Sequence, residues 1–113
     1  MNGCMNLRIR WSEPALLSLS EVLEYTLWMH GRRQAQKMRR QVMDAVRQIS
    51  HSPYMAAVEP YSEKVGVELR GYLVIPRIKV IYSIVNDVVC VEYIKNTFLS
   101  ERTMLQRMGY FID

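Results

Sequence analysis

The chain has 113 residues, a size typical of a single domain that buries its own core without disulfides or metals. Because 50% of the residues are hydrophobic and 23% are charged, the composition excludes a disordered chain, and no apolar run approaches the roughly 20 residues that span a bilayer. We therefore expect one domain, residues 1–113, in a cytoplasmic protein with no membrane contact. A net charge of +4, with eleven arginines and four lysines, suits a nucleic acid or an acidic protein partner.

The first patterned segment is short and alternating. Leu7, Ile9 and Trp11 are apolar, whereas Arg8 and Arg10 between them are charged. A period of two places the apolar side chains on one face of an extended chain. The segment predicts a half-buried first strand with an arginine face.

Two helices are predicted next, separated by a glycine. Ser12 is a good N-cap for a helix over 13–29, and Gly31 suits the residue that follows a helix. A second helix over 32–50 begins at once, so we expect an antiparallel hairpin on one face of a sheet. Apolar residues recur at helical spacing in both segments, and those expected in the core include Leu16, Leu23, Val42 and Ile49.

Basic residues follow another side of the second helix. Arg33, Lys37, Arg40 and Arg47 share this side, and Asp44 interrupts them. One interpretation is a solvated helix face. The other is a surface for a nucleic acid or a protein partner.

The second half of the sequence reads as an antiparallel meander. No period is visible over 54–64, which predicts an irregular loop. Pro76 and Asn86-Asp87 are turn residues between segments rich in Val, Ile and Tyr. The predicted strands are 73–75, 78–84 and 88–94. Alternation directs Val80 and Ile84 toward the core and Lys79 to the opposite face, where we expect Arg70 to converge with Lys79, and Lys95 to lie nearby.

A short last helix is expected over 101–108, with Ser100 as its cap. Tyr110, Phe111 and Ile112 leave a hydrophobic C-terminus that must dock on the domain or on a partner. The predicted fold class is therefore α+β: an N-terminal strand, a helical hairpin, a three-stranded antiparallel meander and a short C-terminal helix.

This order of elements resembles the RelE/ParE superfamily of bacterial toxins over almost the whole chain. The local likeness lies in IRWSEPALLSLSEVLEYT and in IKVIYSIVNDVVCVEYI, since such toxins have a capped helix after the first strand and later a Tyr-rich pattern ending in acidic turn residues. The resemblance implies the toxin of a type II toxin-antitoxin system, neutralised by a cognate antitoxin in a possible hetero-oligomer. RelE-like members cleave mRNA on the ribosome, whereas ParE-like members inhibit DNA gyrase, so fold alone does not choose between them.

We expect the RelE-like activity, a metal-independent mRNA cleavage without a cofactor, and the resemblance also implies its site residues. Arg70, Lys79 and Lys95 would act at the scissile phosphate. RNA-binding roles would fall to Arg77, Arg102 and Tyr110. The arginine common after the last strand in that branch is replaced here by Leu99, and the long helices look more like the ParE branch. The alternatives are a ParE-like gyrase inhibitor without catalytic activity, or a toxin fold used only as a binding module.

Overall fold

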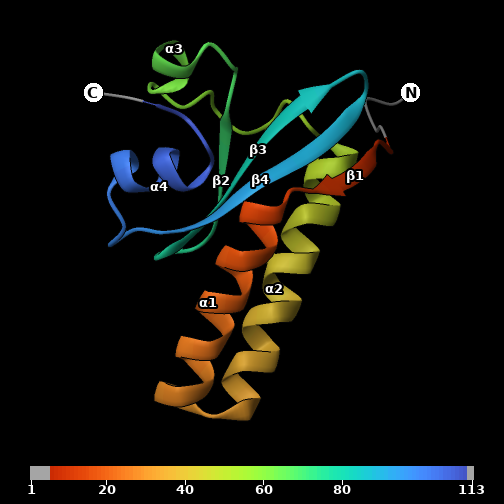
Figure 1. Cartoon of the computed structure of the whole chain (residues 1–113). Coiled ribbons are helices and arrows are strands. Elements are labelled where there is room, and N and C mark those ends of the chain that lie inside the picture. The colour runs from red at the N-terminus through yellow and green to blue at the C-terminus, as the bar shows by residue number, and fades with distance from the viewer. Residues whose placement is uncertain (1–5, 112–113) are drawn as a thin grey trace.

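The structure, a computed structural model, describes residues 6–111 and contains a helical hairpin packed against a four-stranded sheet (Figure 1). Apart from the one-turn helix α3, the order of elements is the one expected from the sequence. The elements are β1 (Arg8–Trp11), α1 (Glu13–His30), α2 (Arg32–His51), α3 (Ser62–Val65), β2 (Arg70–Ile75), β3 (Ile78–Val85), β4 (Val88–Asn96) and α4 (Glu101–Arg107).

The sheet has the strand order β1-β4-β3-β2. The meander of β2, β3 and β4 is antiparallel, as predicted, and β1 runs parallel to β4 at one edge. Asn86 and Asp87 have φ angles of 50° and 60°, so the turn between β3 and β4 has the left-handed geometry that matches strand twist. The first and last strands of the chain are therefore neighbours.

The main core lies between the hairpin and one face of the sheet. Val42, Ile49 and Val80 are fully buried there, as predicted, and Leu23 and Ile84 pack against it half-buried. The prediction for Leu16 is wrong, because its side chain is 53% exposed. Ala15, one position earlier, takes the buried side of α1, and a step of one residue turns a side chain by about 100° around the helix.

Two serines tie α1 to the sheet. Ser12 Oγ accepts the N-capping bond from Ala15 N at 3.1 Å and donates to the Glu92 carbonyl at 3.1 Å. Ser18 Oγ donates to the Ala15 carbonyl and accepts a 2.9 Å bond from Ile94 N. The helix is thus hydrogen-bonded directly to the edge of β4 along its first two turns.

The other face of the sheet carries a second, smaller core. Its buried members lie on β3, β4 and α4 and at the positions just before α3 and β2: Tyr61, Leu69, Ile81, Tyr93, Met104 and Leu105. The loop predicted over 54–64 is more ordered than expected, since it contains the one-turn helix α3 and a bridge between Val58 and Arg70. Ser62 Oγ holds this segment by accepting from Leu69 N at 2.9 Å and donating to the Leu69 carbonyl at 3.1 Å. Both faces of β3 are consequently covered.

The end of the chain docks on this second core. Tyr110 is half-buried against it, whereas Phe111 is exposed, and Ile112 lies outside the described residues. Among the described helices, none combines the length and the hydropathy that a membrane crossing requires.

Candidate functional site

The six predicted site residues are distributed over both faces and one end of the sheet. Arg70 begins β2, Lys79 lies on β3 and Lys95 on β4, whereas Arg77 occupies the turn between β2 and β3. The remaining two come from the C-terminal region: Arg102 is on α4 and Tyr110 follows it. Convergence therefore depends on which face of the sheet each strand residue occupies.

Arg70 and Lys79 lie on opposite faces of the sheet, so the predicted convergence of these two residues is wrong. Arg70 is paired with Tyr82, a member of the core on the helix side. Lys79 is three residues from Tyr82 on the same strand and therefore points the other way.

A register shift on β2 causes this arrangement. Ile75 pairs with Ile78 at the turn, but Leu73 pairs with Lys79, so the pairing slips by one residue at Val74. Without the slip, the pairing of Ile75 with Ile78 would place Arg70 opposite Ser83, on the face of Lys79. A slip of one residue reverses the face of every side chain on the strand beyond it, counted from the turn, and Arg70 is one of these.

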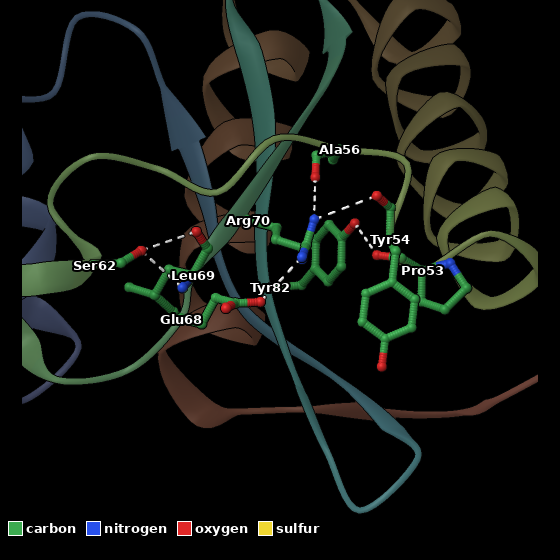
Figure 2. A network of polar contacts seen from close by, with 8 residues as sticks. All are labelled: Pro53, Tyr54, Ala56, Ser62, Glu68, Leu69, Arg70 and Tyr82. Carbon is green, nitrogen blue, oxygen red and sulfur yellow. Dashed lines mark hydrogen bonds and ion pairs between the residues drawn. The ribbon is translucent and has the colours of Figure 1, made fainter.

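Arg70 is engaged by its own chain, as Figure 2 shows. Its Nη1 donates to the Ala56 carbonyl at 2.6 Å and to the Tyr54 carbonyl at 3.3 Å, and its Nη2 donates to the Glu68 carboxylate at 3.0 Å. The guanidinium also lies 5.2 Å from the centre of the Tyr54 ring. With a side chain only 15% exposed, Arg70 fastens the segment after α2 to the sheet.

Tyr82 contributes to the same fastening. Its hydroxyl donates a 2.6 Å hydrogen bond to the Pro53 carbonyl, which is visible beside Arg70 in Figure 2. Burial raises the pKa of the Tyr82 phenol, and the nearby Arg70 cation opposes this only in part. The phenol is therefore a neutral donor, and this cluster is structural in character.

Lys79 forms an ion pair on the other face of the sheet. Its ammonium donates a 2.7 Å hydrogen bond to the Glu59 carboxylate, and the two side chains are 32% and 14% exposed. Gly71 leaves room for this pair, because a Cβ built there would overlap the Glu59 carboxylate and the Lys79 side chain. Glu59 was not predictable from the sequence, since it lies in a segment without a period and contacts Lys79 only through the tertiary fold.

Lys95 is the cross-strand partner of Lys79, so the two lysines share one face. Glu59 neutralises one of the two charges, and within residues 6–111 no side chain forms an ion pair with Lys95. This trio can hold one anionic group through Lys95, with Lys79 close by. The part of the sequence prediction that joins Lys79 and Lys95 is therefore compatible with the geometry.

The other three predicted residues do not join the trio. Arg77 stacks on Phe98, with its guanidinium 5.2 Å from the ring centre. Arg102 is exposed on α4. Tyr110 is half-buried, and burial together with the Glu92 carboxylate raises the pKa of its phenol, which opposes a role as a proton acceptor near neutral pH.

A contact that the sequence did not predict joins α4 to the rest of the domain. Arg107 donates to the Tyr93 hydroxyl at 3.2 Å and lies 3.4 Å from the Glu21 carboxylate on α1. No local pattern indicates this contact, because the three residues lie on three separate elements. In the described part of the chain, His, Cys, Asp and Glu side chains form no group of three that could hold a metal ion.

Six exposed apolar or aromatic side chains lie on α1. The helix has more apolar residues than its contacts with α2 and β4 bury, so these six remain accessible. Trp28 is 81% exposed and Leu17 is 59% exposed, and further exposed members are Leu16, Tyr25, Leu27 and Met29. Exposed apolar side chains gathered on one helix mark an interaction surface.

Comparison with known proteins agrees with the fold. No model of a protein family matches the sequence, and no curated protein matches it. Among solved structures, the chain is similar to one titled "Chromosomal ParDE TA system from P. aeruginosa", with a TM-score of 0.64 over 80% of this chain and 96% of that chain. At 14% sequence identity the likeness is one of fold, and it confirms the RelE/ParE-like fold expected from the sequence.

Proposed function

We propose that the protein is the toxin of a type II toxin-antitoxin pair, held inactive in the cytoplasm by a cognate antitoxin. The fold supports this proposal, since it corresponds to almost the whole of a chain from a ParDE toxin-antitoxin structure. The observation that carries it is the exposed apolar side of α1, with Trp28 and Leu17. An amphipathic antitoxin segment would cover this surface.

The hydrophobic C-terminal region, which the sequence predicted to dock on the domain or on a partner, is not the antitoxin surface proposed here. Met104 and Leu105 are buried in the second core and Tyr110 is half-buried, so most of the apolar C-terminal region is occupied by its own domain. The helix α2 packs beside α1 in the hairpin, and its basic residues would suit acidic residues of the same antitoxin segment.

A co-expression experiment tests the partner. The adjacent reading frame is expressed with the toxin, and the complex is isolated by pull-down. Leu17→Glu and Trp28→Ala should weaken the complex, whereas Leu73→Ser, at an exposed apolar residue of β2, should not. If all variants retain the partner equally, the antitoxin does not bind at α1.

For the mode of action we propose ParE-like inhibition of DNA gyrase by binding, without catalysis. Two contacts favour this mode: the Arg70 guanidinium is directed at carbonyls of its own chain, and the Lys79 charge is paired with Glu59. Together they leave few free cations for a phosphate. The length of α1 and α2, 18 and 20 residues, agrees with the ParE-like branch of the resemblance.

The second candidate is metal-independent cleavage of mRNA on the ribosome. The observation in its favour is the cross-strand pair of Lys79 and Lys95 on one face. Lys95 would stabilise the charge on the phosphate, Lys79 would assist it, and Arg77, Arg102 and Tyr110 would bind the RNA. Loss of one such donor typically costs about 100- to 1000-fold in rate, so Lys95→Ala would abolish toxicity in this case.

Two assays decide between the two modes: gyrase supercoiling with the purified protein, and primer extension on mRNA from induced cells. We expect inhibition of gyrase supercoiling, with no new mRNA ends in primer extension after induction. New mRNA ends with unchanged supercoiling would replace this proposal by the endonuclease. In that case, loss of mRNA cleavage in folded Lys79→Ala and Lys95→Ala variants would locate the site at this pair.

A further inference from the structure

A groove of about 880 Å³ lies between the helical hairpin and the end of the sheet where β2 turns into β3. The hairpin projects beyond the sheet on this side (Figure 1), so that α1 and α2 form one wall. The turn residue Arg77, Asn96 at the end of β4 and Phe98 just after this strand form the other wall. The groove lies apart from the Lys79–Lys95 pair, which points to the second core.

The charge in this groove has one sign. Lys37 from α2 and Arg77 from the turn line it, and none of its described lining residues is an aspartate or a glutamate. Arg33 and Arg40 lie four positions before and three positions after Lys37, so they share the same side of α2 and extend the positive rim. Three side-chain amides, those of Gln34, Gln41 and Asn96, supply neutral donors and acceptors.

Two aromatic rings stand at the border of the groove. Tyr25 is 57% exposed and Phe98 is 77% exposed. Both also line a smaller neighbouring groove, so the rings form the ridge between the two. The Phe98 backbone is fixed by a 2.9 Å bond from its N–H to Asn96 Oδ1, and Arg77 stacks on the ring. Each ring therefore offers a flat face to a ligand.

We propose that this groove binds single-stranded nucleic acid. Unpaired bases stack on Tyr25 and Phe98, the phosphates lie between Lys37 and Arg77, and the amides of Gln34 and Gln41 contact base edges. Aromatic platforms beside a groove of positive charge are what single strands require, because every base has a face to stack and every nucleotide has a phosphate. A duplex would hide its bases from these rings. The proposal goes beyond toxin action and does not depend on it.

Fluorescence anisotropy with labelled 12-nucleotide oligouridine and oligothymidine tests the binding at about 50 mM salt. We expect both to bind, and Tyr25→Ala and Phe98→Ala to weaken binding at least about fivefold each. The matched charge variants are Lys37→Gln and Arg39→Gln, since Arg39 is two residues away but lines a groove on the other side of the hairpin. Lys37→Gln should weaken binding and reduce the salt slope by roughly 0.7, whereas Arg39→Gln should change affinity less than twofold.

All four substituted side chains are exposed, so thermal melting should confirm folded variants in each case. Tighter binding of oligouridine assigns the groove to RNA, and tighter binding of oligothymidine assigns it to DNA. Absence of binding by both oligomers overturns the proposal and leaves the groove to a protein segment. Equal losses in Lys37→Gln and Arg39→Gln, with wild-type affinity in both aromatic variants, also overturn it, because they indicate only a diffuse attraction to α2.

Discussion

The Lys79 ammonium and the Glu59 carboxylate meet at 2.7 Å directly above Gly71. Gly71→Ala should therefore destabilise the fold by about 1 to 3 kcal/mol, because the added Cβ overlaps both side chains. Urea unfolding measures this free energy. In the double variant with Glu59→Ala the clash with Glu59 is absent, so the two changes together should cost less than the sum of the single changes. Additive losses would show that the pair does not lie over Gly71.

Arg70→Ala should lower the free energy of unfolding by about 1 to 3 kcal/mol. The change removes the donor to the Tyr54 carbonyl, which is exposed, and to the Ala56 carbonyl, which is part-buried and loses this partner. Arg102→Ala is the control, since Arg102 is exposed and should have a near-zero effect. If Arg70→Ala keeps wild-type stability but loses toxicity, Arg70 acts on a target and the structural role assigned to it is wrong.

Core packing predicts a graded series of three alanine substitutions. Val80 is fully buried, Leu23 is half-buried and Leu16 is exposed. Val80→Ala should destabilise the fold by on the order of 1 to 3 kcal/mol. Leu23→Ala should cost less than the same substitution at a fully buried leucine, and Leu16→Ala should have little effect. Chemical denaturation of the three variants orders them directly. A large loss for Leu16→Ala would mean that α1 is rotated relative to the sheet.

Two buried tyrosines should respond in opposite directions to removal of the hydroxyl. The Tyr61 hydroxyl is buried with no hydrogen-bond partner among the described residues, whereas the Tyr82 hydroxyl donates to the Pro53 carbonyl. Tyr61→Phe should be neutral or stabilising at pH 7, and Tyr82→Phe should cost about 1 kcal/mol or more. The melting temperatures of both variants test this order.

Tyr61 also predicts alkaline sensitivity. Burial raises the pKa of its phenol above the ordinary value of 10.0, with further contributions from Glu59 and Glu101. Above about pH 10 the unfolded chain releases this proton and the folded chain keeps it, so stability falls as the pH rises, by about 1.4 kcal/mol per pH unit. Tyr61→Phe should therefore lose less stability than the wild type between about pH 10 and 11. Parallel losses would mean that Tyr61 ionises normally in the folded protein.

The sequence predicted most of the fold because its signals are local. Ser12 and Ser100 both cap helices as expected, and Asn86-Asp87 forms the expected turn. The sheet face on which Arg70 lies was not predictable in the same way. It depends on a register slip of one residue at Val74, and no residue type there indicates such a slip. The Glu59–Lys79 contact was also out of reach, since it joins residues 20 positions apart through an irregular segment.

The pairing of β1 with β4 has a consequence for how the chain folds. Arg8 faces Val88 across this pair, and Ser12 Oγ bonds to the Glu92 carbonyl 80 positions away. These contacts close a loop that includes most of the chain. The chain therefore loses the conformational entropy of closing this long loop when β1 joins the edge of the sheet. High contact order of this kind slows folding. During synthesis the N-terminal strand must therefore wait, unpaired, until the last quarter of the chain has been made.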